Sequence, residues 1–228
     1  MQELAAASEE IADTPTRPAG LLRLNVPLAA YMFVLQPVIG RFLAAYPEVT
    51  VEVSIDSSLV DIVGLGFDAG IRFGSIVERD MVGVRVGPPL VTSIVASPQY
   101  IAARGLPTHP RDLLQHDCIV FRFISSGQLE RWEFEKDGEQ IKLAVGGRLV
   151  LNEITSMLQA AIDGIGIANV IGSYTDRYVE NGRLVRVLAD WSPALPQLML
   201  YYPDRRRVPA KLRVLIDFLR EGGRLDGT

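Results

Sequence analysis

Cysteine and histidine are almost absent from this chain, which limits the chemistry it can perform. Cys118 is the single cysteine in 228 residues, so an internal disulfide is excluded and a reducing compartment is favoured. The two histidines, His109 and His116, lack cysteine or carboxylate partners at ligand spacing, so we expect no metal site. No G-x-S-x-G motif of a serine hydrolase occurs. We therefore expect no catalytic residues, no cofactor and no enzymatic activity.

Signals for export, membrane insertion and DNA binding are also missing. Residues 1–13 contain acids where a signal peptide needs a basic start and an apolar core. The longest uncharged apolar stretch, 24–40, contains Pro27 and Pro37 and is shorter than the roughly 20 residues that span a bilayer. The net charge of −4 lacks the broad basic face that phosphates require. We expect a cytoplasmic protein that does not enter a membrane and, as this chain alone, binds DNA poorly.

What the sequence does contain is an alternation of strand and helix patterns in a chain that is 48% apolar. A short strand at 21–26 is followed by apolar residues at helical spacing from Leu35 to Tyr46, and residues 49–55 alternate with the period of a half-buried strand. Leu59, Ile62 and Val63 suggest a short helix before a buried strand at 68–74. This order predicts an α/β fold.

The second half continues the pattern. Strands are predicted at 82–86, 91–96, 119–123, 165–170 and 197–202, and helices at 98–104, from Asn152 as N-cap to Gly164, and after Pro209. Residues 132–151 read as a hairpin, because Asp137-Gly138 supplies the positive φ angles of a tight turn.

Two motifs invite a functional interpretation that their context does not favour. Gly64-Leu-Gly66-Phe-Asp-Ala69 loosely matches a dinucleotide-binding pattern, but the required order of strand before and helix after is reversed, so we interpret it as a turn. The basic run Arg205-Arg206-Arg207 is a candidate phosphate contact, yet a solvated helix start explains it better.

Strand-to-helix junctions give a more informative signal. The strands at 21–26 and 148–151 each lead directly into a helix. Ligands of open α/β sheets bind beyond the carboxyl ends of strands, where helix N-termini offer free N–H groups and partial positive charge. Two such ends facing each other would form a site for a small anion, although every α/β protein has junctions of this kind.

Taken together, several segments resemble the effector-binding domain of LysR-type transcriptional regulators. The matching pieces follow one another from about residue 20 to 220, and their order and spacing make the resemblance specific. They are GLLRLNVP (20–27), PVIGRFLAAYPEVTVEV (37–53), VDIVGLGFDAGIRFG (60–74), VASPQYIAARGLPTHPRDLLQHDCI (95–119), DGIGIANV (163–170), NGRLVRVL (181–188) and YYPDRRRVPAKLRVLIDFL (201–219).

The resemblance implies two Rossmann-like lobes joined by two crossover strands, as in type 2 periplasmic binding proteins. With crossings near 93–98 and 194–198, lobe I would comprise residues 20–95 plus 197–228, and lobe II residues 96–196. Residues 1–19 would be a linker-helix remnant and tether. The family implies a homodimer or homotetramer that pairs the helix 35–46 with a strand–helix edge of another copy, and contacts DNA through an N-terminal helix-turn-helix missing here.

The resemblance also implies where a small-molecule effector would bind. The expected cleft residues of lobe I are Leu28, Ala29, Ala30, Arg72 and Phe73, and those of lobe II are Arg122, Phe123, Asn152, Glu153, Ile154, Asn169 and Val170. Many relatives carry a serine or threonine where Ala29 and Ala30 stand, so the sequence favours a more apolar effector or one anchored by an arginine.

A solute-binding protein of a transport system shares this fold, but it needs export. An enzyme on this scaffold would need an acid–base or nucleophile set in the cleft.

Overall fold

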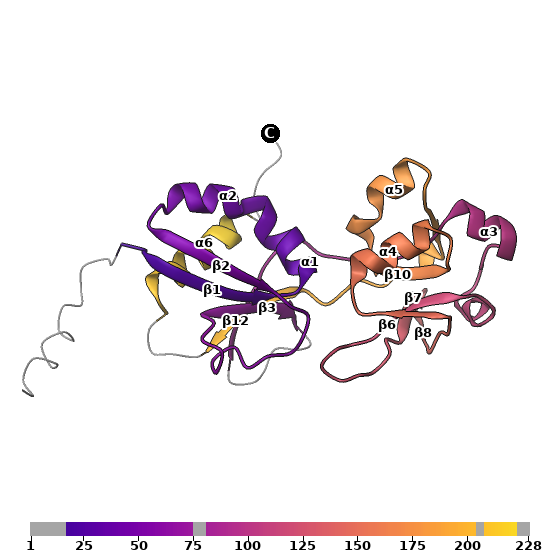
Figure 1. Ribbon diagram of the computed structural model, residues 1–228, viewed down its shortest axis with the longest axis horizontal. Coiled ribbons are helices and arrows are strands. Elements are labelled where there is room, and N and C mark those ends of the chain that lie inside the picture. The colour runs from indigo at the N-terminus through magenta and orange to yellow at the C-terminus, as the bar shows by residue number, and fades with distance from the viewer. Residues whose placement is uncertain (1–16, 75–80, 204–207, 223–228) are drawn as a thin grey trace, which may run out of the picture.

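The computed structural model describes residues 17–74, 81–203 and 208–222, and they form two α/β lobes side by side (Figure 1). Each lobe is built around a five-stranded mixed sheet. Lobe I contains both the first strands and the last strand and helix of the described chain, coloured indigo and yellow in Figure 1. The predictions for residues 1–13 and Arg205–Arg207 lie outside the described residues.

The sheet of lobe I has the order β2-β1-β3-β12-β4. Strand β1 pairs parallel with β2 and β3, whereas β12 pairs antiparallel with β3 and β4. Its strands are β1 (Gly20–Val26), β2 (Val49–Ile55), β3 (Ala69–Phe73), β4 (Met81–Arg85) and β12 (Leu198–Pro203).

One long helix follows β1 and begins earlier than its sequence pattern predicts. It runs through α1 (Leu28–Ala30), the π-helical turn η1 (Tyr31–Leu35) and α2 (Gln36–Ala45). Pro37 has no N–H to donate, and the wider turn directly before it lets the helix continue past the proline. The helix packs against α6 (Ala210–Gly222), whose buried face carries the four predicted residues Leu212, Leu215, Ile216 and Leu219.

Lobe II has the strand order β11-β5-β10-β6-β9, with β5 antiparallel to both of its neighbours. The predicted turn at Asp137-Gly138 is confirmed, because both residues have positive φ and the strands on either side pair antiparallel. The hairpin ends at Leu143, however, and residues 149–151 of the predicted range form a strand that pairs parallel with Ile119–Phe121 in the main sheet. The strands are β5 (Thr92–Ala96), β6 (Cys118–Phe121), β7 (Trp132–Lys136), β8 (Glu139–Leu143), β9 (Leu149–Leu151), β10 (Ile167–Ile171) and β11 (Val185–Val187). The helical segments are α3 (Pro98–Arg104), η3 (Pro110–Gln115), α4 (Ile154–Ile162), η4 (Gly172–Tyr174), α5 (Asp176–Glu180) and η5 (Ala189–Trp191).

Alternation along the strands of lobe II builds a core on each face of its sheet. Ile94 belongs to one buried cluster and its neighbour Val95 to the other, and Ile167 and Ala168 divide in the same way. Trp132, from the hairpin, closes the first cluster, and α4 closes the second. Both faces are therefore covered, as expected for a largely buried α/β sheet.

Two expectations about local structure are wrong. The residues expected to form a short helix around Leu59–Val63 instead form a loop and a series of turns at 62–66, because the Asp61 carboxylate accepts from the N–H groups of Val63 and Gly64. Gly66 has φ +70° there, which agrees with interpreting the glycine pattern as a turn. The N-cap of α4 is Glu153 and not Asn152.

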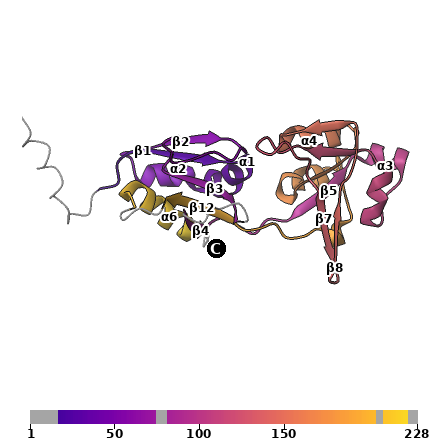
Figure 2. The ribbon, with the colours of Figure 1, turned by 90° about the horizontal axis from the view of Figure 1, so that it is seen from below.

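The segments 86–91 and 192–197 connect the two sheets and lie side by side (Figure 2). Leu195 N–H donates to the Leu90 carbonyl at 2.8 Å, and Val91 and Ala194 form an antiparallel bridge. Strand β5 pairs within lobe II from Thr92 onward. The residue boundaries expected for the two lobes stay a prediction.

Candidate functional site

The two lobes touch at two places where the candidate effector site is expected. The backbone N–H of Leu59 in lobe I donates to Ser125 Oγ in lobe II at 2.7 Å. The rings of Phe33 and Tyr174 lie 4.8 Å apart between centroids. Three of these contact residues, Phe33, Ser125 and Tyr174, are close in sequence to expected site residues, and Leu59 is not. Helices α1 and α4 lie on facing sides of the lobes (Figure 1).

The first helical turn after β1 presents backbone groups to this region. Pro27 is the N-cap of α1 and makes no side-chain capping bond. Ala29 and Ala30 are buried, and Leu28 is half-buried. The first N–H groups of a helix have no partner within the helix, so this turn can serve an acceptor or an anion from its backbone.

Arg72 is committed to holding lobe I together. Its guanidinium donates to Asn25 Oδ1 at 2.5 Å and to the carbonyl oxygens of Asp56 and Ser58 at 3.2 and 2.9 Å. Burial lowers the pKa of Arg72, and electrostatic interactions with Tyr201 and Asp56 partly oppose that shift. Phe73, the next residue, packs against the core of lobe I. Arg72 therefore joins the ends of β1 and β2, and most of the N–H groups of its guanidinium already donate to acceptors within lobe I.

In lobe II, Arg122 and Phe123 lie exposed on the loop after β6. Arg122 donates to the Gly127 carbonyl at 2.6 Å, which closes the loop locally. Phe123 contacts Phe121 edge to face at 5.3 Å and is 45% exposed. This loop also contains Ser125, so it offers an apolar ring beside the inter-lobe hydrogen bond.

Glu153 occupies the N-terminus of α4, where an anion was expected to bind. Its carboxylate accepts from the N–H groups of Thr155 and Ser156 at 2.8 and 2.7 Å. Desolvation is the largest single influence and raises the pKa of Glu153, but the bonds from Thr155 and Ser156 together outweigh it and lower that pKa. The negative charge at this helix end disfavours a second anion, so the expectation of two facing anion-binding helix ends is wrong for α4. Asn152 is exposed, and Ile154 packs on the core beneath α4.

Asn169 and Val170 lie on the central strand β10. Val170 is part of the core that α4 covers, so its side chain is used in packing. Asn169 is 7% exposed, and its Oδ1 has no hydrogen-bond partner among the described residues. Buried polar atoms are nearly always paired, so this oxygen marks a place where a partner is missing.

Tyr174 is a candidate site residue that sequence reasoning missed. Its hydroxyl is buried and without a hydrogen-bond partner in the described part of the chain, and its ring contacts Phe33 across the lobes. Burial raises the pKa of Tyr174, and the charge of Glu153 raises it further. The only signal in the sequence is an aromatic residue a few positions after β10, which gives no hint of a contact with the other lobe.

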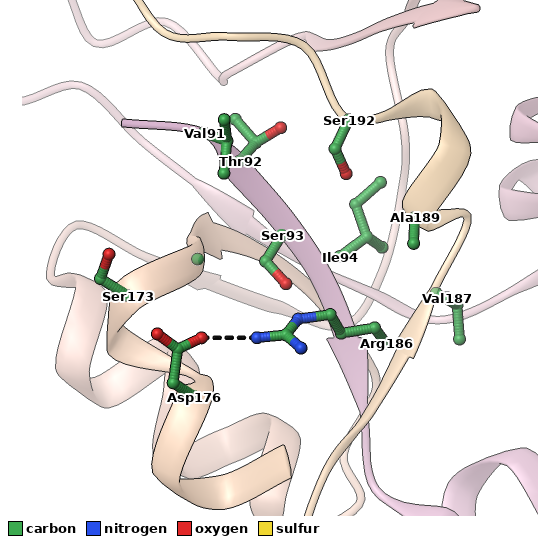
Figure 3. Close-up of a pocket in the computed structure, with 11 residues that line it drawn as sticks. Val91, Thr92, Ser93, Ile94, Ser173, Asp176, Arg186, Val187, Ala189 and Ser192 are labelled. Carbon is green, nitrogen blue, oxygen red and sulfur yellow. Dashed lines mark hydrogen bonds and ion pairs between the residues drawn. The ribbon is translucent and has the colours of Figure 1, made fainter. Parts of the chain in front are cut away.

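A separate cavity of about 260 Å³ lies in lobe II beside the connecting segments (Figure 3). None of the twelve expected effector-binding residues lines it. Its walls come from β5, β11, η4, α5 and η5, and they include an ion pair between Arg186 and Asp176.

Within residues 17–74, 81–203 and 208–222, no group of three or more His, Cys, Asp or Glu side chains could hold a metal ion. One helical stretch, Leu28–Ala45, is long and apolar enough to cross a membrane by length and composition alone. Its buried residues, such as Val34, Leu35 and Phe42, pack into the core of lobe I, as in a core helix of a folded domain.

Two mixed α/β lobes that are connected by two chain segments define a class of protein: the two-lobed, type 2 periplasmic-binding-protein-like fold. The family described as the LysR substrate binding domain matches residues 15–224. The chain therefore belongs to this family and is the effector-binding domain of a LysR-type transcriptional regulator.

Similar proteins agree with this assignment. The chain is 39% identical over 221 residues to the uncharacterized HTH-type transcriptional regulator YcaN of Escherichia coli, covering 96% of this chain and 72% of that protein. It is 34% identical to the HTH-type transcriptional regulator PgrR of the same organism, covering 98% and 75%. The full-length structure of the virulence activator AphB of Vibrio cholerae superposes with a TM-score of 0.76 at 26% identity, covering 96% and 73%. These relatives favour a regulator over a transport protein.

Proposed function

We propose that a small-molecule effector binds between the two lobes, close to Tyr174, and changes their relative orientation. The observation that carries this proposal is the Tyr174 hydroxyl, which is buried at the contact with Phe33 and has no partner among the described residues. A ligand atom that bonds to this hydroxyl would offset a desolvation cost that the free protein already bears. Such a ligand shifts the lobes only if it binds one arrangement better than the other.

The charges around Tyr174 indicate the chemical class of this effector. Glu153 places a negative charge beside Tyr174, which favours an amine or hydroxyl donor on the ligand. The uncapped turn at Leu28, Ala29 and Ala30 favours a carboxylate or carbonyl at the other end. Phe33 and Phe123 add apolar surface. Arg72 contributes only indirectly, because its guanidinium is bound within lobe I.

A thermal-shift and calorimetric screen of small acids, amines and aromatic metabolites tests this proposal. An amine-bearing or hydroxyl-bearing ligand should raise the melting temperature, and Glu153→Gln should weaken its binding. Glu135→Gln is the matched control, because Glu135 is an exposed glutamate on the hairpin strand β7, away from the lobe contact. Binding that Glu153→Gln and Tyr174→Phe leave unchanged would place the effector elsewhere.

The proposal extends to assembly and location. The chain would act in the cytoplasm as part of a homodimer or homotetramer, and the effector would change how the DNA-reading modules of the full-length protein are presented. Leu43 on α2 is 39% exposed and would lie in the contact between copies. Sedimentation of Leu43→Glu tests this, since a charge in an apolar contact should shift the assembly toward monomers.

We further propose that the domain binds its effector without converting it. The ionisable groups near the expected site are engaged structurally: Glu153 caps α4 and Arg72 ties strand ends together. Incubating the protein with an identified ligand and measuring its concentration over time tests this directly. Turnover that Glu153→Gln abolishes would instead assign an enzymatic function.

A further inference from the structure

The cavity in lobe II has a polar lining of its own that includes none of the residues of the two inter-lobe contacts, although Ser173 in its wall is next to Tyr174 in the sequence. It lies over strand β5, between the η4–α5 segment on one side and η5 on the other (Figure 3). Val91 and Ser192 belong to its lining, and these residues stand on the two segments that connect the lobes. A molecule in this cavity would therefore contact lobe II and both connecting segments at once.

The charged residues of the cavity neutralise each other. Arg186, from β11, donates to Asp176 Oδ1 at 2.5 Å, and Figure 3 shows this pair at one end of the cavity. With one cation and one anion joined, the lining has no net charge that would select an ionic ligand. The pair still offers further N–H groups and a second carboxylate oxygen, the combination that binds hydroxyl groups.

Hydroxyl groups gather at the other end of the cavity. Thr92 and Ser192 lie at that end, and Ser93 lies between it and Arg186 (Figure 3). The hydroxyl of Thr92 is buried and has no hydrogen-bond partner within the described ranges. Ser93 is 4% exposed and accepts a long bond of 3.5 Å from Thr175 Oγ1. Because a buried hydroxyl without a partner costs free energy, this end of the cavity is prepared for a polar occupant.

We propose that this cavity is a second binding site, for a neutral polyhydroxylated molecule of monosaccharide size. Its volume of about 260 Å³ is below the roughly 300–1,000 Å³ of pockets that hold drug-sized ligands. Hydroxyls of the ligand would bond to Thr92 and Ser192 at one end and to the Arg186–Asp176 pair at the other. Ile94 and Val187 provide apolar surface for the carbon-bound hydrogens of a sugar ring.

Occupation of this site would stiffen the connection between the lobes. The ligand would hold Thr92 and Ser192 in place beside the bridge between Val91 and Ala194. A site coupled to lobe orientation is coupled to any effector that acts through the same orientation, and the coupling is reciprocal.

The test is a titration of the full chain, labelled with ¹⁵N, with D-glucose, D-ribose and myo-inositol, and with D-gluconate as a charged comparator. At least one neutral compound should give saturable shifts of amide signals at residues of the cavity lining, namely 92–94, 172–173, 176, 186–187, 189 and 192. Thr92→Val should weaken that binding by about 3- to 10-fold, the value of one hydrogen bond. The loss of a buried hydroxyl that lacks a partner should not unfold the protein.

Controls separate this site from the effector site. Thr50→Val, at an exposed threonine of β2, should leave the affinity for the neutral compound unchanged. Glu153→Gln should also leave it unchanged, so failure of one proposal does not entail failure of the other. The proposal is overturned if none of the three neutral compounds gives saturable shifts, if the shifts centre on 152–154 and Tyr174, or if gluconate binds more tightly than all of them.

Discussion

Leu59 of lobe I and Ser125 of lobe II are joined by a hydrogen bond of 2.7 Å between residues that are 66 positions apart in the chain. Both residues are exposed, Leu59 to 58%, so the bond competes with water and is worth about 1 kcal/mol or less. A link of this strength can break and form again readily. The lobes are thus held together at this edge by a contact weak enough for a ligand to reinforce or replace.

Removing that link should loosen the edge without unfolding either lobe. Ser125→Ala deletes the acceptor, and we expect a more open average arrangement, measured as a larger radius of gyration or a longer distance between labels on the two lobes. Ser126→Ala is the matched control, because the Ser126 hydroxyl accepts only a local bond from Gln128 N–H in the described structure. Equal behaviour of the two variants would show that Ser125 does not hold the lobes.

Tyr174→Phe should not reduce stability, although Tyr174 is largely buried. The hydroxyl has no partner in the described part of the chain, while the ring contact with Phe33 is kept. The free energy of unfolding should be unchanged or rise by up to about 1 kcal/mol, measured by urea denaturation. A clear loss of stability would mean that the hydroxyl is satisfied in the free protein, which would also weaken the proposed effector site.

Arg72→Met should destabilise the domain strongly. It leaves Asn25 Oδ1 and the carbonyl oxygens of Asp56 and Ser58 without their donor, at a cost on the order of 3 kcal/mol. The midpoint of thermal unfolding should fall by roughly 10 °C. Arg122→Met is the comparison, since its single described bond lies on an exposed loop and the change should cost less than about 1 kcal/mol. An Arg72→Met protein that melts like the unmodified chain would free Arg72 for direct ligand contact.

Glu130 should make stability depend on pH. Burial, with a smaller influence from Glu133, raises the pKa of Glu130 from its usual 4.5 to about 7 in the folded state. Between these values the folded chain holds a proton that the unfolded chain has released, so the free energy of unfolding falls as the pH rises from 4.5 to 7.

Glu130→Gln should remove this dependence. At pH values above 7 the variant should be more stable by about 1 to 3 kcal/mol, a range that allows for partial solvent exposure, and the difference should vanish below pH 4.5. Denaturation curves across this pH range provide the measurement, with the exposed Glu135→Gln as control. A variant that keeps the slope of the unmodified protein would assign the slope to other groups.

The order of strands and helices could be predicted from the sequence because it depends on local periodicity. The alternation in 49–55 became β2, and Asp137-Gly138 became the turn between β7 and β8. Errors arose where one side chain overrides the pattern. Asp61 bonds to nearby N–H groups and forms turns in place of a helix, and Glu153 takes the capping position from Asn152.

The site was harder to predict, because its properties depend on contacts between distant residues. Nothing in the sequence around Arg72 reveals that Asn25, Asp56 and Ser58 surround its guanidinium. Tyr174 lies beyond the last expected site residue, and only the folded chain brings it to Phe33. The Arg186–Asp176 cavity is likewise assembled from five elements and leaves no motif in the sequence.

The paired connecting segments also decide how the lobes can move. Leu195 N–H bonds to the Leu90 carbonyl and Thr92 N–H to the Pro193 carbonyl, and Ile171 of lobe II is buried in the core of lobe I nearby. Two connecting segments that are hydrogen-bonded to each other resist twisting and sliding better than a single flexible linker would. If a ligand moves the lobes as proposed, the motion left to them is a rotation about these paired segments, and the contact between Leu59 and Ser125 would be displaced more than the segments themselves. Different ligands would then differ in the angle at which they hold the lobes.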